Sequence, residues 1–129
     1  MQTREPALSV LLDRHPSSAA RARHAVQQFL GDDTTIAFTR DALLLTSELV
    51  ANAVAYTTDG CHLSAWFDSD RRQLRVEVSD ASAELPGTQV DEAPSGGLGR
   101  GLRLVDTIAA DWGTISTAHG KTIWFELYD

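Results

Sequence analysis

Residues 37–57 constrain the fold more than any other segment of the chain. The run FTRDALLLTSELVANAVAYT within it is long enough for roughly five to six helical turns. Its residues are apolar on most of the helix circumference, whereas a surface helix would carry a single apolar stripe. The segment is therefore predicted to be the buried central helix of the domain.

Two polar residues interrupt this helix, and both project from the same side. Glu48 and Asn52 are spaced i, i+4, and Glu48 is the only charged residue between Ala42 and Thr57. Burying a carboxylate without a partner costs several kcal/mol, and asparagine is a poor residue for a helix interior. We therefore expect this side to face a polar cavity or an ion. An exposed stripe on an amphipathic helix remains the alternative, although such a stripe normally holds more polar positions.

The segments around this helix predict an α+β domain. A serine N-cap in the Pro16-Ser17-Ser18 run is expected to start a first helix, and two alternating segments after the central helix read as an antiparallel hairpin. With helices and strands in this order, the helices should lie on one face of a mainly antiparallel sheet. The expected strands are residues 7–13, 61–67, 74–79, 112–118 and 121–128, and the other expected helices are residues 19–30 and 100–110.

Length, charge and cysteine content limit the classes of function. The 129 residues are enough for one domain, spanning residues 1–129. The formal net charge of −7 argues against direct nucleic-acid binding, which needs a surplus of Lys and Arg. No apolar run approaches the length of a membrane span, and the single cysteine, Cys61, fits a reducing compartment. We therefore expect a cytoplasmic protein with no membrane segment.

Two further features have the chemistry of a ligand site. Asp80 follows a strand, where a carboxylate can accept a hydrogen bond from a ligand's amino group, although turn residues and caps are commoner there. Residues 96–102, GGLGRGL, lie at a loop-to-helix junction, where glycines let the backbone approach a phosphate. The spacing fits neither a dinucleotide-binding fingerprint nor a P-loop. A flexible loop that ends in a helix cap remains the alternative.

Taken in order, four segments resemble the four motifs of the GHKL ATPase superfamily, and they resemble its anti-sigma factor serine/threonine kinases most. The resemblance covers nearly the whole chain and implies a Bergerat-type two-layer α/β sandwich. The matching segments are residues 48–54 (ELVANAV), 80–82 (DAS), 97–106 (GLGRGLRLVD) and 120–125 (GKTIWF).

The resemblance implies a role for each matching residue, with ATP and Mg²⁺ as cofactors. Glu48 would be the general base, and Asn52 would coordinate the Mg²⁺ that bridges the ATP phosphates. Asp80 would accept from the adenine amino group, with Thr122 supporting it; a strand Thr is by itself more often packing. The remaining implied nucleotide contacts come from the two glycine motifs: Ser82, Gly97, Gly99, Arg100, Gly101 and Leu102.

The same resemblance implies the function. The expected protein is an ATP-binding anti-sigma regulatory factor that holds a sigma factor inactive and phosphorylates an anti-anti-sigma (STAS-domain) partner. The first alternative is a binding module of the same fold that sequesters a partner without kinase activity. A sensor histidine kinase fragment is less favoured, because no helix with a phospho-accepting His precedes the domain. Relatives often form dimers, which makes a homodimer one expected assembly.

Overall fold

The computed structural model describes residues 5–56, 59–80, 99–117 and 120–129. The order of strands and helices is the predicted one, and most boundaries lie within one or two residues of those expected. The elements are β1 (Leu8–Leu12), α1 (Ser18–Leu30), α2 (Ile36–Tyr56), β2 (Cys61–Asp68), β3 (Gln73–Asp80), α4 (Gly99–Ile108), β4 (Asp111–Thr117) and β5 (Gly120–Tyr128).

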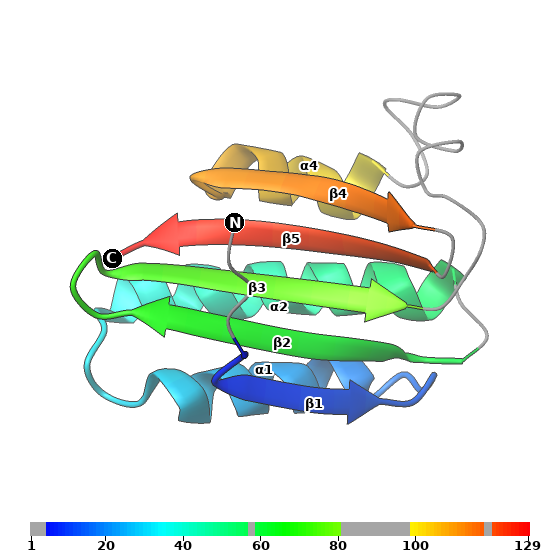
Figure 1. Cartoon of the computed structure of the whole chain (residues 1–129), viewed down its shortest axis with the longest axis horizontal. Helices are drawn as coiled ribbons and strands as arrows, with labels where there is room; N and C mark the ends of the chain where they lie inside the picture. The colour runs from blue at the N-terminus through cyan, green and yellow to red at the C-terminus, as the bar shows by residue number, and fades with distance from the viewer. Residues whose placement is uncertain (1–4, 57–58, 81–98, 118–119) are drawn as a thin grey trace.

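The strands form one five-stranded sheet in the order β1-β2-β3-β5-β4 (Figure 1). Every neighbouring pair in this sheet is antiparallel. β3 pairs with β5 over its whole length, from Gln73 opposite Tyr128 to Asp80 opposite Lys121. The end of β3 and the beginning of β5 therefore lie side by side, although Asp80 and Lys121 are 41 positions apart in the sequence.

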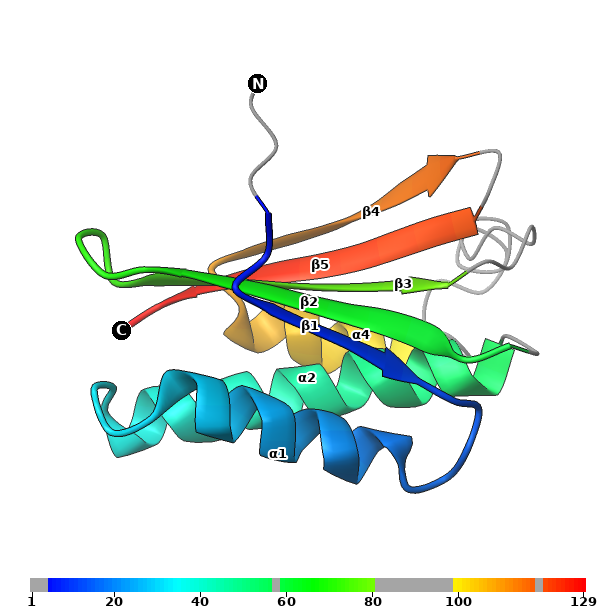
Figure 2. The same cartoon turned by 60° about the horizontal axis from the view of Figure 1, so that its bottom comes forward.

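Within the described residues, helices α1, α2 and α4 cover the same face of the sheet, and α2 lies between α1 and α4 (Figure 2). A hydrogen bond of 2.8 Å from Arg23 of α1 to Ser47 of α2 joins the first two helices. The predicted two-layer α+β sandwich with helices on one face is confirmed. No helix within the described part of the chain is long and apolar enough to cross a membrane.

The hydrophobic core fills the space between the sheet and the helices. Alternate residues of β3 and β5 point toward the helices, as the two-residue period of a strand requires. Each large aliphatic or aromatic side chain that is fully buried here contributes roughly 1.5–3 kcal/mol. The side chains with the least exposure include Leu45, Leu49, Val50, Leu63, Leu74, Val76, Val105 and Phe125.

The start of α1 differs from the predicted serine N-cap. Ser17 occupies the N-cap position with helical backbone angles, and its side chain makes no capping bond. Ser18 is the first helical residue, and its buried hydroxyl donates to the Asp13 carbonyl at 2.6 Å. Ser18 therefore joins the start of α1 to the residue that follows β1, and this bond replaces the capping bond that was predicted for a serine.

Gly60 lies in the connection from α2 to β2, where the chain passes the end of β1. Its φ of +92° is in the region that favours glycine, and a Cβ added there would lie 2.2 Å from the Leu12 carbonyl oxygen. Only a glycine lets these two backbones approach so closely. This contact fixes one edge of the cavity described below.

Helix α4 is attached at its C-terminal end to the neighbouring strand. The indole N–H of Trp112, on β4, donates to the Asp106 carboxylate at 2.9 Å. Leu102 and Val105 of the same helix are buried in the core. The helix that begins at the glycine motif is therefore fixed by its middle and its far end.

Candidate functional site

Glu48 and Asn52 lie on the flank of α2 that faces α4. Ser47 bonds to α1, and successive helical residues are about 100° apart, which places Glu48 and Asn52 roughly 100° and 140° around the helix from Ser47. Because α2 lies between α1 and α4, the flank away from α1 faces the helix that begins at Gly99. Both side chains are half-buried, so they lie neither in open solvent nor sealed inside the core.

The Asn52 amide has an unmet hydrogen-bonding need. Its Oδ1 atom is buried and has no hydrogen-bond partner among the residues that the structure describes. A buried amide oxygen without a partner costs about 1–3 kcal/mol, and such sites in native proteins call for an explanation. An amide oxygen is also a suitable ligand for a hard cation such as Mg²⁺, which usually takes one or two protein groups together with waters and phosphate oxygens. The residue therefore fits the metal-binding role that the resemblance implies.

A metal held by protein side chains alone has no ready site in the described residues. Within residues 5–56, 59–80, 99–117 and 120–129, no group of three or more His, Cys, Asp or Glu side chains could hold a metal ion. A cation beside Asn52 would therefore take ligands from elsewhere as well, which matches the usual reliance of Mg²⁺ on phosphate and water oxygens.

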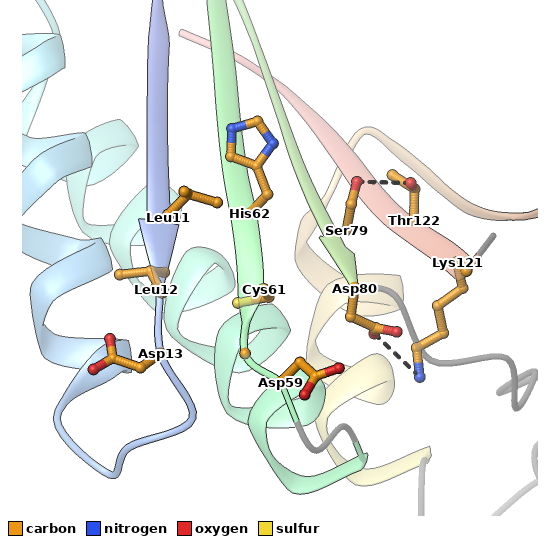
Figure 3. A pocket seen from close by; sticks show the side chains of 12 residues that line it. Leu11, Leu12, Asp13, Asp59, Cys61, His62, Ser79, Asp80, Lys121 and Thr122 are labelled. Carbon is orange, nitrogen blue, oxygen red and sulfur yellow. Dashed lines mark hydrogen bonds and ion pairs between the residues drawn. The ribbon is translucent and has the colours of Figure 1, made fainter.

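Asp80 and Lys121 form an ion pair at the ends of β3 and β5. They are partners in the strand register, and Lys121 Nζ lies 3.5 Å from Asp80 Oδ2. Figure 3 shows the two side chains pointing toward each other where β3 ends and β5 begins. The Lys121 side chain is 2% exposed and that of Asp80 is 1% exposed. Both charges therefore lie on the helix-covered face, among positions that are otherwise apolar.

Thr122 lies on the other face of the sheet. Its hydroxyl forms a 2.8 Å hydrogen bond with the hydroxyl of Ser79, the neighbour of Asp80 (Figure 3). The side chain that the structure brings to Asp80 is that of Lys121. Neighbouring strand residues point to opposite faces, so Thr122 does not contact Asp80 directly, and the supporting role that the resemblance implies for Thr122 stays a prediction.

A cavity of about 650 Å³ opens at these strand ends. Asp80, Lys121 and Thr122 line it, but Glu48 and Asn52 do not. The structure therefore brings the strand-end residues together at the cavity, and the part that Glu48 and Asn52 play in the same site stays a prediction. The other lining residues come from the end of β1 and the residue after it, the connection before β2, the start of β2, the end of β3 and the start of β5: Leu11, Leu12, Asp13, Asp59, Gly60, Cys61, His62, Ser79 and Gly120.

Cys61 contributes a buried thiol to the same cavity. Burial raises its pKa from 9.0 to about 11, and the negative charge of Asp80 adds to the shift. A thiol with so high a pKa stays protonated at neutral pH and is a poor nucleophile. Cys61 therefore forms a small, buried and unreactive part of the cavity wall.

The glycine motifs are described only in part. Gly99 and Gly101 lie in the first turn of α4, together with Arg100, whose side chain lies outside the described part of the structure. Ser82 and Gly97 lie in residues 81–98, outside the described residues. The Leu102 side chain is buried in the core, so any contact with a nucleotide would use its backbone. The roles of these residues stay predictions.

Comparison with known proteins gives a family and a fold. A family model described as "Histidine kinase-like ATPase domain" matches residues 12–127. A search of curated protein sequences found no match. Among solved structures, the RsbU and RsbW domains of Rv1364c from Mycobacterium tuberculosis match with a TM-score of 0.71 and 22% identity, over 94% of this chain.

A second solved structure shares the fold. The histidine kinase domain of a blue-light activated histidine kinase from Erythrobacter litoralis matches with a TM-score of 0.59 and 22% identity, over 86% of this chain. The present chain spans 32% of the first matching chain and 59% of the second. With a family model that covers nearly its whole length and a fold shared with both structures, the chain belongs to the histidine kinase-like ATPase domain family.

Proposed function

We propose that this chain is an ATP-binding regulatory protein of the anti-sigma kinase type, with serine/threonine kinase activity toward an anti-anti-sigma partner. One observation carries the proposal. The half-buried Glu48 carboxylate and the Asn52 amide lie one turn apart on the α2 flank that faces α4, and the buried amide oxygen has no partner within the described part of the chain. Membership of the ATPase family supplies the class of ligand.

The chain's own residues divide the work of binding. Asn52 would offer its amide oxygen to Mg²⁺, and the first turn of α4, with Gly99 and Gly101, would offer backbone N–H groups to the phosphates. Bound Mg²⁺ would supply the charge screening that a triphosphate needs on a protein of net charge −7. Asp80 would accept a hydrogen bond from the base at the other end of the site.

The chemistry assigned to the chain is modest, as phosphoryl transfer requires. The Glu48 carboxylate would take the proton from the attacking serine or threonine hydroxyl. The hydroxyl oxygen would then bond to the γ-phosphorus as the bond to the bridging oxygen breaks, releasing ADP. General base catalysis of this kind typically contributes 10²–10⁴-fold in rate.

The partner assignment follows from the anti-sigma resemblance of the sequence, and the fold match to a structure that contains an RsbW domain is consistent with it. A binding module that sequesters a partner without phosphorylating it is the second candidate. The intact Glu48 favours the kinase, because a pure binding module has no need of a half-buried carboxylate on this flank.

The test separates binding from transfer with matched variants of α2. Titration calorimetry with Mg-ATP should show Mg²⁺-dependent binding by wild type and Glu48→Gln, and binding at least about tenfold weaker by Asn52→Ala. Ser47→Ala, on the opposite flank, should bind as wild type does. Phosphate transfer to purified STAS-domain proteins should fall by about 10²–10⁴-fold in Glu48→Gln.

The outcomes distinguish the candidates. Absence of Mg²⁺-dependent ATP binding by the wild type overturns the proposal as a whole. Binding of ATP with no transfer to any STAS-domain protein favours the sequestering module. Equal transfer rates for wild type and Glu48→Gln refute the role of Glu48 as base.

A further inference from the structure

Lys121 occupies a position where strand geometry would place an apolar side chain. It shares the helix-covered face of β5 with Ile123, Phe125 and Leu127, all of which are buried. Its strand partner Asp80 ends the corresponding row on β3, after Leu74, Val76 and Val78. The charged pair thus lies at the end of the two adjacent rows of apolar side chains on β3 and β5, and it lines the cavity.

Attraction between two buried charges does not by itself make such a pair strongly stabilising. Removing both charges from water costs several kcal/mol per ion, and mutual attraction repays this only with close geometry. The 3.5 Å separation of Nζ and Oδ2 is longer than the roughly 2.7–2.9 Å of a close charge-assisted bond. The pair is buried and lies on the wall of the cavity, so both charged groups are placed where a ligand can reach them.

The two side chains are chemically complementary to one edge of adenine. A carboxylate only accepts hydrogen bonds and an ammonium only donates them. The adenine edge presents a donating 6-amino group beside the accepting ring nitrogen N1. An ammonium has three N–H donors and a carboxylate several acceptor positions, so a paired Lys and Asp can each also bond a ligand.

We propose that Lys121 reads the base directly, by donating from Nζ to N1 of adenine while Asp80 accepts from the 6-amino group. The inference rests on the proposed ATP-binding function and assigns to Lys121 the role of a specificity-determining residue. Hypoxanthine carries an oxygen and an N–H at the same two positions. In the same orientation it would set its oxygen against the carboxylate and its N–H against the ammonium, so ITP should be rejected.

The experiment compares analogues that differ by a single ring atom. Titration calorimetry with the full chain and Mg²⁺ would use ATP, 1-deaza-ATP, which lacks the N1 acceptor, and 3-deaza-ATP as the matched control. The wild type should bind 1-deaza-ATP at least about tenfold more weakly than ATP, because a donor to a charged group is left unpaired. Its affinity for 3-deaza-ATP should stay close to that for ATP.

Variants of Lys121 separate direct reading from a structural role. Lys121→Met, which keeps the length of the side chain, should bind ATP and 1-deaza-ATP with equal affinity. Lys121→Gln, which keeps an N–H donor, should recover part of the preference for ATP. Circular dichroism of each variant would establish that it is folded before its affinities are compared.

Every outcome bears on one of the two claims. Equal binding of ATP and 1-deaza-ATP by the wild type overturns the role of Lys121 and leaves the proposed ATP-binding function standing, and this measurement requires no variant to fold. A preference for ATP that persists unchanged in Lys121→Met assigns the N1 contact to another group and also overturns it. Failure of the wild type to bind ATP at all overturns the proposed function together with this inference.

Discussion

The two faces of the sheet carry charge in different ways. On the open face, Arg75 bonds to Glu77 and to Glu126, each at 2.8 Å, and its guanidinium lies 4.1 Å from the centre of the Trp124 ring. On the helix-covered face, Asp80 and Lys121 are more deeply buried yet farther apart, at 3.5 Å. The side chains of the Arg75 group are still 19–28% exposed.

The comparison distinguishes partly hydrated charges on an exposed face from fully buried charges that line a cavity. Groups that keep part of their hydration give up little on folding and gain little from pairing. Fully buried groups lose their hydration, and a pair that recovers only part of it is a weak stabiliser. The open-face cluster therefore shields the unpartnered side of the sheet, whereas the covered pair is retained at a cost to stability beside the cavity.

The largest expected effect tests the covered pair. Lys121→Met removes the ammonium that pairs with the buried Asp80 carboxylate, which should lower the free energy of unfolding by about 3–5 kcal/mol. The double variant Lys121→Met/Asp80→Leu should recover most of this loss, because an apolar pair suits the covered face. Urea denaturation followed by circular dichroism measures both. A double variant no more stable than the single one would contradict the view that the pair costs stability.

The next effect uses the covered face's thiol. Folding raises the pKa of Cys61 from 9.0 to about 11, so the folded state keeps its proton where the unfolded state loses it. The stability of the wild type should therefore be unaffected below pH 9 and fall by about 1–2 kcal/mol as the pH rises from 9 to 11. Denaturation of wild type and Cys61→Ala over this range isolates the thiol. Parallel curves for the two proteins would show that its pKa is not shifted.

A smaller effect is expected on the open face. Arg75→Met removes two partly exposed ion pairs and the contact with Trp124, and should lower the free energy of unfolding by about 1–2 kcal/mol. The loss should shrink in 1 M salt, where exposed charges are screened. A loss as large as that of Lys121→Met, insensitive to salt, would remove the distinction between the two faces.

The smallest effect concerns a hydroxyl with no ligand to explain it. Thr46 on α2 is fully buried, and its Oγ1 has no hydrogen-bond partner in residues 5–56, 59–80, 99–117 and 120–129. Thr46→Val should raise the free energy of unfolding by up to about 1 kcal/mol and leave Mg-ATP binding unchanged. Asn52→Ala should instead weaken Mg-ATP binding. A loss of nucleotide affinity in Thr46→Val would mean that the two orphan groups cannot be assigned different roles.

The sequence was sufficient for the arrangement of the elements and insufficient for the partners of individual side chains. The apolar periods of the strands and of α2 predicted which faces meet, and those predictions are confirmed by the sheet order and the core. Lys121 is four residues from Phe125, so the two-residue period of a strand already places both on the covered face. The pairing of Lys121 with Asp80 additionally depends on the register of β3 and β5. The role that the resemblance implies for Thr122 stays a prediction.

Other features depend on the folded chain in ways that sequence does not record. The serine at the start of α1 could be recognised as a helix signal, but its bond to the Asp13 carbonyl depends on how β1 returns to the helix layer. The missing partner of Asn52 is likewise visible only once α2 has been placed between its neighbours. Motif residues Ser82 and Gly97 lie outside the described residues and stay predictions.

The bond between Trp112 and Asp106 gives the protein an optical reporter of its own. Indole emission responds to the loss of a hydrogen bond and to water, so the Trp112 signal would follow any separation of α4 from β4. The chain has three tryptophans, and Trp66 and Trp124 lie on strands whose alternation points them to the open face. In a Trp66→Phe/Trp124→Phe variant, the fluorescence of Trp112 alone would report the packing of α4 against β4 without an added dye.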